Sequence, residues 1–409
     1  VFQILRWLLL AAEIVIAVPI FYLCLLSLSA AWETCRRSSR QRRLSAEVAD
    51  RYYRIAILIP AHNEELIINT LLKSLAALDY PVDRYLVCLV ADNCTDQTAE
   101  LARAFKGVRV YERFDQTNRG KGYALNWIIQ ELEGEKTPYE AYVVLDADSV
   151  VEPAFLHLLN RELATGAQAL QASNTVLNTT DSPSTALRWI ALSLMNHVRP
   201  LGRNGLGASS TLTGNGMCLR RSLLLRYPWQ AFSTGEDYQY YLTLVENGER
   251  VRYVPEAVVR SQMPIRFDQM RTQDIRWEAT DDSQSARQRV PTLLRAGLKA
   301  RDFVRLEAAM EVLVPPLSFL VVACSLLLVA SFVLWSALNL WISLVLIVGL
   351  LAYIGSAFYL LRPPLAVYRA ILYAPGFVVW KLWVYLVLRR NPRYTGAWVR
   401  TERTPHEVV

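Results

Sequence analysis

The sequence predicts an α/β domain with a mainly parallel sheet, flanked by transmembrane helices. Between residues 51 and 260, short apolar runs alternate with helical patterns, which is the order that βαβ units produce. Longer apolar runs lie near the two ends of the 409-residue chain. The hydrophobic content of 53% and the mean hydropathy of +0.18 are high for a purely soluble protein.

The first apolar run, from Ile4 to Leu28, is long enough to cross a bilayer, which takes roughly 20 residues. A cluster of arginines follows it: Arg36, Arg37, Arg40, Arg42 and Arg43. Basic residues collect on the cytoplasmic side of spans, which places the N-terminus outside and residue 35 onward in the cytoplasm. A cleaved signal peptide is the alternative, but its apolar core would be only about 7–15 residues and its basic residues would precede it.

Three apolar runs in the middle of the chain predict buried parallel strands: Arg54–Pro60, Tyr85–Ala91 and Tyr142–Leu145. Helical patterns follow them, from about 64 to 77, 96 to 105 and 121 to 132. In such sheets, ligands bind beyond the C-terminal ends of the strands. Polar residues at those ends are therefore the first candidates for a binding site.

Two further apolar runs, Val312–Trp335 and Leu340–Leu361, predict a hairpin through the membrane. A weaker run extends from Tyr368 to Leu388. A span there would carry the arginines that follow it to the outside, against the charge rule. We therefore predict three spans, with residues 368–388 interfacial or re-entrant; four spans are the alternative.

These observations divide the chain into six parts. They are a transmembrane helix (1–31), a basic linker (32–50), a cytoplasmic α/β domain (51–260), an interfacial region (261–307), a C-terminal membrane region (308–390) and a basic tail (391–409). The C-terminal membrane region contains two spans plus an interfacial or third span. We expect an integral protein of the plasma (inner) membrane, with the α/β domain on its cytoplasmic side.

The net charge is +7 and the isoelectric point is about 9.1. Much of the basic excess lies beside apolar segments, which favours anionic lipid as the partner. There is no ladder of basic and aromatic residues, so we expect no nucleic acid. The six cysteines are scattered without zinc-ligand spacing, which is typical of reduced packing residues.

The strongest candidate for chemistry is the pair Asp146 and Asp148, which follows an apolar strand directly. Once the strand gives way to a turn, both carboxylates can converge on one hard cation. Mg²⁺ or Mn²⁺ accepts such oxygen ligands, bridges them to substrate phosphates and neutralises charge on a departing diphosphate. The alternative is a polar turn in which Asp148 caps the next helix.

Two other motifs lie at strand ends or helix starts. The segment 118–122, Asn-Arg-Gly-Lys-Gly, precedes a helix, and its glycines, cations and helix N-terminus suit a diphosphate. Asp92 ends the second strand, where it could accept hydrogen bonds from a uracil N–H or a ribose hydroxyl. The alternatives are an ordinary basic turn and a strand end followed by a helix cap.

Glu236 and Asp237 open a helical stretch, where a carboxylate could serve only as an N-cap. The functional alternative is a general base that takes the proton of an acceptor hydroxyl during sugar transfer. Asp237 is the first choice for this role and Glu236 the second. The preceding loop, Gly214-Asn215-Gly216, would let backbone approach a sugar closely, or is an ordinary turn.

Gln273, Arg276 and Trp277 share one helical face just before the membrane. Arg276 can bond a diphosphate through its fork of donors, Trp277 offers a flat apolar face for a sugar, and Gln273 can bond sugar or phosphate oxygens. The alternative is an interfacial Trp/Arg anchor.

In chain order the motifs are a Pro-x-x-Asn-Glu strand end, the Asp92 turn, Arg-Gly-Lys-Gly, D-x-D, a Gly-rich loop, Glu-Asp and Q-x-x-R-W. Over roughly residues 54–277 this order resembles the inverting glycosyltransferase family 2, especially its membrane synthases for cellulose, chitin and hyaluronan. The resemblance implies a glycosyltransferase A-type domain that binds a nucleotide-sugar. One departure is Gly235-Glu236-Asp237, where the synthases often carry Thr-Glu-Asp or Gly-Asp-Asp.

The resemblance implies roles for individual residues. It makes Asp237 the base and Asp148 the metal ligand, with Asp146 beside it. Donor or nucleotide contacts are expected from Pro60, Asn63, Glu64, Asp92, Lys121, Asp146 and Arg276. Acceptor contacts are expected from Gly214, Asn215, Gly216, Glu236, Gln273 and Trp277.

The sequence thus predicts a membrane enzyme that uses Mg²⁺ or Mn²⁺ to move a sugar from a nucleotide-sugar, in the first instance a UDP-sugar, to a growing β-linked polysaccharide. The alternative is transfer of one sugar to a lipid such as ceramide, diacylglycerol or a polyprenyl carrier, which the compact membrane region favours. A third hypothesis, an inactive membrane scaffold, is disfavoured because no expected acidic position is missing. The other expected partners are membrane lipids, and a homo-oligomer is compatible with the sequence.

Overall fold

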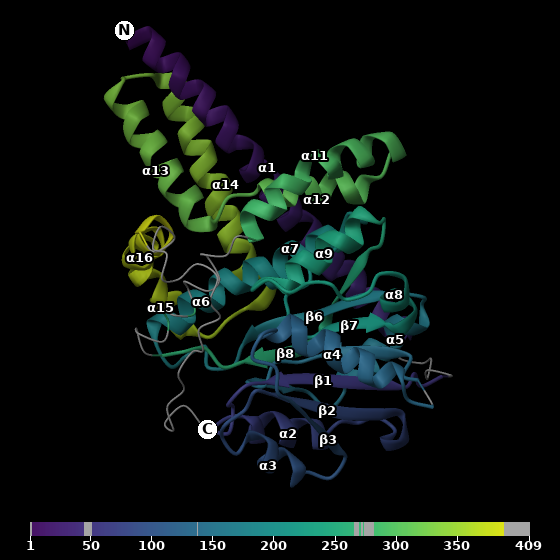
Figure 1. Cartoon of the computed structure of the whole chain (residues 1–409). Helices are drawn as coiled ribbons and strands as arrows, with labels where there is room; N and C mark the ends of the chain where they lie inside the picture. Colours follow the sequence, from purple (N-terminus) through teal and green to yellow (C-terminus); the bar gives the residue numbers. More distant parts are fainter. Residues whose placement is uncertain are drawn as a thin grey trace.

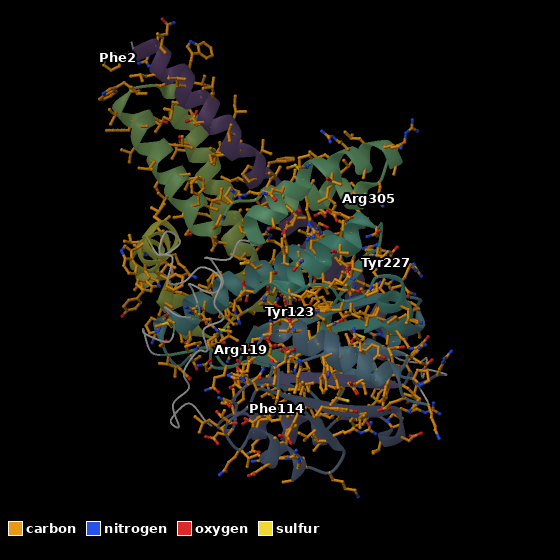
Figure 2. All side chains as sticks on the ribbon, in the orientation of Figure 1. Phe2, Phe114, Arg119, Tyr123, Tyr227 and Arg305 are labelled. Carbon is orange, nitrogen blue, oxygen red and sulfur yellow. The ribbon has the colours of Figure 1, made fainter. Side chains whose placement is uncertain are left out.

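The computed structural model describes residues 2–44, 51–136, 138–265, 270, 273 and 282–387. A sheet domain lies in the lower part of Figure 1, and a group of long helices extends away from it. The N-terminal helix α1 (Phe2–Leu44) connects the two parts. In Figure 2, Phe2 marks the outer end of this helix and Phe114 the opposite side of the molecule, in the sheet domain.

The sheet has eight strands in the order β3-β2-β1-β4-β7-β6-β8-β5. Only β5 and β7 pair antiparallel with their neighbours, and the predicted mainly parallel sheet is confirmed. The strands are β1 (Ile55–Ala61), β2 (Tyr85–Asp92), β3 (Val108–Arg113), β4 (Ala141–Val144), β5 (Ser149–Val151), β6 (Ala169–Val176), β7 (Met217–Arg220) and β8 (Val251–Ser261).

Both faces of the sheet are covered, which is why its central strands are continuous apolar runs. In β1, Ile57 packs on one face and Leu58 on the other, because successive side chains of a strand point to opposite sides. One face carries α2 (Ile68–Ala76), α3 (Thr98–Arg103) and α5 (Phe155–Ala164). The other carries α4 (Lys121–Glu133), α8 (Arg221–Arg226), α9 (Glu236–Glu246), α11 (Asp282–Ala300) and α12 (Phe303–Leu313).

The C-terminal helices are α13 (Leu317–Val333), α14 (Ala337–Leu361), α15 (Leu365–Ala370) and α16 (Ala374–Val387). Helices α13 and α14 form the expected hairpin and pack against α1 (Figure 1). Among the described residues, three helical segments are long and apolar enough to cross a membrane: 2–37, 337–361 and 365–384. Helices α12 and α13 meet at 66°, and a fourth span results if this bent pair counts as one. The number of spans therefore stays a prediction.

Three linked helices between β6 and β7 were not foreseen from the sequence. They are α6 (Pro183–Ser193), the π-helical turn η2 (Leu194–Val198) and α7 (Arg199–Gly205). A capping box of Ser182 and Thr185 starts α6. Helix α7 packs closely on α1, since a Cβ on Gly202 would lie 2.2 Å from the Leu26 carbonyl oxygen. These helices join the sheet domain to the membrane helices in one apolar cluster.

Candidate active site

The D-x-D pair lies at the C-terminal end of β4, as the sequence predicts. Leu145 N–H donates to the Leu58 carbonyl and extends the pairing with β1, and the chain then turns toward β5. The Asp146 backbone N–H donates to Asn215 Oδ1 at 3.1 Å. The Asp146 side chain is 38% exposed, and Asp148 is half-buried. Both carboxylates are thus reachable at the edge where parallel sheets bind ligands.

Lys121 joins three of the predicted motifs. It is the first residue of α4, after Gly120, whose φ of 118° favours glycine. Its Nζ donates to Asp146 Oδ1 at 2.5 Å and to the Gly214 carbonyl at 2.6 Å, and lies 3.6 Å from Glu236 Oε1. Figure 2 shows Arg119 and Tyr123, which flank it, in the middle of the molecule.

The ammonium group of Lys121 stays charged in this position. Burial lowers its pKa, but the carboxylates of Asp146, Glu236 and Asp237 act in the opposite direction and raise it above the ordinary value. The result is a fixed positive charge among three acidic side chains.

Glu236 and Asp237 begin α9 and face this lysine. Burial raises the pKa of both carboxyl groups, and the charge of Lys121 partly offsets the effect. Asp237 Oδ1 accepts a hydrogen bond from its neighbour's backbone N–H at 2.8 Å. A Cβ on Gly214 would lie 3.0 Å from Asp237 Oδ2, so the loop passes close to the carboxylate and leaves no room for a side chain there.

The loop around Asn215 is held from three strands. Asn215 Nδ2 donates to Ser149 Oγ of β5 and Ser261 Oγ of β8, each at 2.8 Å. Gln171 of β6 accepts from Thr213 N–H and donates to the Asn215 carbonyl. Both ends of the Asn215 amide are therefore used within the protein, where they hold Asp146 in place.

Gly216 explains the close approach of this loop to the sheet. Its φ is 74°, and a Cβ would lie 2.8 Å from the Ala172 Cβ of β6. Only glycine fits both conditions. Gln171 was not predicted, because β6 mixes polar and apolar residues and only the fold shows that this glutamine is buried.

Asp92, the predicted nucleotide contact, ends β2 in a buried polar cluster. Its Oδ1 accepts from Arg113 Nη1 at 2.7 Å and from Asn93 Nδ2 at 3.0 Å. Burial raises the pKa of Asp92, and Arg113 partly offsets this. Arg113, which ends the neighbouring β3, was not predicted, because only strand pairing places it beside Asp92.

The first strand end lies beside the second. Pro60 is half-buried within β1, and Asn63 has a φ of 57° just after it. Asn63 Oδ1 accepts from Thr95 N–H at 2.7 Å, and Glu64 N–H donates to Thr98 Oγ1 at 2.8 Å. These bonds join the loops that follow β1 and β2, so Asn63 and Glu64 shape the edge of the Asp92 site.

Part of the Q-x-x-R-W motif can be placed. Gln273 is buried, and its Oε1 accepts from Arg188 Nη1 of α6 at 3.3 Å. Arg188 Nη2 also donates to the Met270 carbonyl at 3.5 Å. Arg276 and Trp277 lie outside the described residues, so their predicted roles stay predictions.

The metal ligands that the protein offers are sufficient for a cation only if a bound substrate supplies further ligands. Asp146 and Asp148 are two carboxylates at one strand end, and the described part of the chain contains no group of three or more His, Cys, Asp or Glu that could hold a metal alone. A Mg²⁺-type ion typically takes one or two carboxylates and completes its shell with phosphates and water. The pair therefore suits a cation shared with a diphosphate.

Comparison with known proteins gives an independent result. Residues 53–280 match the sequence model of a family described as glycosyltransferase like family 2. The probable glycosyltransferase YdaM of Bacillus subtilis is 26% identical over 245 residues, 55% of this chain and 54% of the relative. A beta-monoglucosyldiacylglycerol synthase of Nostoc is 31% identical over 191 residues, 46% of this chain and 40% of the relative. The chain thus spans about half, or less, of the length of these curated relatives.

Several solved structures cover most of the chain. One of them is a mannosyltransferase from Pyrobaculum calidifontis in complex with GDP-Man and Mn²⁺. The TM-score is 0.48 and the sequence identity 18%, over 88% of this chain and 99% of that chain.

Proposed function

The chain belongs to glycosyltransferase family 2, and from this premise we propose that it transfers a sugar from a nucleotide-sugar to a lipid acceptor in the membrane. The observation that carries the proposal is Lys121, which joins Asp146 and Gly214 beside Asp237 at one edge of the sheet. The glycolipid synthase among the relatives supports the lipid acceptor over the polysaccharide that the sequence first suggested.

The donor is bound along the C-terminal ends of β1, β2 and β4. Asp92, positioned by Arg113, accepts hydrogen bonds from the nucleoside, at a loop edge shaped by Pro60, Asn63 and Glu64. The α4 N-terminus directs its backbone N–H groups toward the diphosphate. In our proposal, the charge of Lys121 adds to this attraction.

Asp146 and Asp148 would hold a Mg²⁺ or Mn²⁺ ion, which when bound supplies positive charge against the leaving diphosphate. Lys121 Nζ already contacts Asp146 Oδ1, so the lysine and the cation would share this carboxylate. Asn215 acts in our proposal as a positioning residue for Asp146. Gly214 and Gly216 provide the backbone that the acceptor approaches.

The chemical step follows from the place of Asp237. The acceptor hydroxyl oxygen bonds to the anomeric carbon as the bond from that carbon to the diphosphate oxygen breaks. The nucleoside diphosphate leaves with the bonding electrons, and Asp237 takes the hydroxyl proton. A carboxylate with a raised pKa is a better base than an exposed aspartate. Attack opposite to the leaving group inverts the anomeric configuration.

The setting of the site is also part of the proposal. The apolar helices at the two ends hold the protein in the plasma membrane, and the arginines after the first of them keep the domain 51–260 in the cytoplasm. The acceptor then arrives from the membrane side, past α6 and Gln273.

The test uses the purified full chain in lipid nanodiscs with a panel of UDP- and GDP-sugars and Mg²⁺ or Mn²⁺. Diacylglycerol, ceramide and a polyprenyl phosphate are offered separately as acceptors. We expect nucleotide release that depends on one acceptor, a product carrying one sugar by mass spectrometry, and loss of activity in EDTA. A product that carries many sugars would contradict the lipid acceptor and support a polysaccharide acceptor. Activity unchanged in EDTA would show that Asp146 and Asp148 hold no metal that the reaction needs.

The matching test of the base is Asp237→Asn. A general base contributes about 10²–10⁴-fold, so kcat should fall by that factor with the donor still bound. Asp83→Asn, at an exposed site just before the N-terminal end of β2, is the control. Full transfer activity in Asp237→Asn would show that Asp237 is not the general base.

A further inference from the structure

A cavity of about 470 Å³ lies between the sheet and the membrane helices. Its walls come from the C-terminal parts of β6 and β8, from α6 and η2, and from residues 361–364, which comprise the last residue of α14 and the three that follow it. Its volume is within the range of small-molecule sites, about 300–1,000 Å³. None of the predicted donor, acceptor or metal residues that the structure describes lines it.

The cavity wall is rich in groups that both donate and accept hydrogen bonds. They are Ser173, Asn174, Thr175, Thr179, Thr180 and Ser193. Among the described residues no carboxylate lines the cavity, the charge of Arg260 is paired with Glu152 at 2.7 Å, and the other lining cation, Arg362, is exposed to solvent. Because its cations are paired or solvated, such a wall suits a ligand that bears hydroxyl groups and no net charge.

Ser193 is the clearest sign that a ligand belongs here. The residue is 4% exposed, and its Oγ has no hydrogen-bond partner among the residues that the structure describes. A buried hydroxyl left unpaired costs about 1–3 kcal/mol, so such groups normally find a partner. A ligand hydroxyl in the cavity would supply one.

Two rings complete the wall. Trp189 of α6 offers an apolar face of the kind that packs on sugar or glycerol C–H groups. His197 Nδ1 lies 2.9 Å from the Tyr253 hydroxyl, and burial lowers the pKa of His197 to about 4. The imidazole is therefore uncharged at neutral pH and adds another neutral hydrogen-bonding group.

The position of the cavity connects it with both the membrane and the reaction. Leu361 is the last residue of the candidate span α14, and residues 362–364 come directly after it. Lipid headgroups lie at the ends of membrane spans. Toward the candidate active site, the cavity residue Trp189 is next to Arg188 in α6, and Arg188 donates a hydrogen bond to Gln273. Ser261, next to Arg260 in β8, bonds Asn215 beside Asp146.

We propose that this cavity binds the uncharged, hydroxyl-bearing headgroup of the membrane lipid that accepts the sugar. The inference rests on the proposed function, which it extends by naming the acceptor class and the residues that select it. The hydroxyl groups of Ser193 and Thr175 bond the headgroup, and Trp189 packs against it.

The experiment measures equilibrium binding of two radiolabelled probes to the purified full chain without any donor. One is a short-chain diacylglycerol, the neutral acceptor named above, and the other is a short-chain phosphatidylglycerol as the anionic comparison. Ser193→Val removes the buried hydroxyl, and Thr175→Val removes a half-buried one at constant shape. Ser325→Val, on the exposed face of α13, is the matched control.

We expect the neutral probe to bind more tightly than the anionic one. Loss of one buried hydrogen bond should weaken binding of the neutral probe about tenfold in Ser193→Val and several-fold in Thr175→Val. Binding should not change in Ser325→Val. Wild-type affinity in both cavity variants would overturn the proposal. So would tighter binding of the anionic probe that Arg362→Gln abolishes, since Arg362 is the exposed cation at this wall.

The result separates the site from the enzyme activity. A chain that binds the neutral probe through Ser193 and Thr175, but transfers sugar to no lipid, would support the cavity and contradict the proposed function. Transfer to diacylglycerol with wild-type acceptor KM in both variants would support the function and overturn the cavity.

Discussion

Lys121 sets the charge balance of the candidate active site. Its ammonium group lowers the pKa of Asp237, whereas burial raises it. A base must be ionised to act, so activity should fall as the pH drops through the pKa of Asp237. In Lys121→Gln the opposing charge is absent, and that pKa rises further.

The acidic limb of the pH profile of kcat should therefore move to higher pH in Lys121→Gln, measured at saturating donor. Lys73→Gln, on the exposed surface of α2, is the control and should keep the wild-type profile. An acidic limb at the same pH in both variants would show that Lys121 does not act on the titrating group.

Gly214 is a second residue whose identity matters to the site. Its φ of 73° is costly for any side chain, and a Cβ would also lie 3.0 Å from Asp237 Oδ2. Gly107 has a similar φ of 85°, but no atom lies within 4 Å of its Cβ position. The two positions separate backbone strain from contact with the carboxylate.

We expect Gly214→Ala and Gly107→Ala each to lose about 1–2 kcal/mol of stability, because both place alanine at positive φ. Only Gly214→Ala should also lower kcat, by at least about tenfold, because its methyl group displaces Asp237. Thermal melts and steady-state kinetics measure the two effects. An equal loss of kcat in both variants would show that backbone strain alone, and not contact with Asp237, lowers kcat.

At the scale of helices, a buried ionic cluster ties four of them together. Arg203 of α7 bonds Glu307 of α12 twice, at 2.6 and 2.7 Å, and its Nη2 also donates to the Tyr241 hydroxyl of α9 at 2.8 Å. The Tyr22 hydroxyl of α1 donates to Glu307 Oε1 at 2.5 Å. Tyr241 is one helical turn after Asp237, so the cluster also positions the helix that carries the proposed base.

Removal of one partner from this cluster should be severe. Arg203→Met leaves Glu307 buried without its cation, and the loss of stability should be about 3–5 kcal/mol. Arg226→Met breaks the exposed pair with Glu249 and should cost less than about 1 kcal/mol. Denaturation of both variants in the same detergent measures the difference. The double variant Arg203→Met/Glu307→Gln should recover part of the loss.

At the scale of the whole molecule, orientation in the membrane is the main prediction. From the arginines after the first candidate span we expect the α/β domain to lie in the cytoplasm. A cysteine at the exposed position 83, introduced as Asp83→Cys with Cys35 replaced by Ser, should react with an impermeant thiol reagent only in inside-out vesicles. Reaction of this cysteine in right-side-out vesicles would show that the domain lies on the opposite side of the membrane.

Several local features could be predicted from the sequence because their causes are local. The apolar runs predicted the ends of β1, β2 and β4 to within one residue. A strand that is buried on both faces of a sheet is a continuous apolar stretch, and this makes it visible in the sequence. Helix α4 begins at the predicted Lys121, where the preceding Gly120 stops the extended chain. The position of Asp146 and Asp148 at a strand end follows from the same reasoning.

Other features depend on residues that are distant in the chain, and only the tertiary structure decided them. Arg203 and Glu307 are 104 positions apart, and Arg113 reaches Asp92 through strand pairing. The strands β5 to β8 and the helices α6 to α7 combine polar and apolar residues without a clear period, so their pattern did not predict them.

The sequence by itself determined the chemistry that is available at the strand ends, because residue type and local period specify it. The tertiary structure decided that Lys121 meets Asp146 and Gly214, and that a hydroxyl-lined cavity lies between the sheet and the membrane helices. The physical reason is that such contacts depend on strand order and helix packing, which long-range burial determines and local propensity does not.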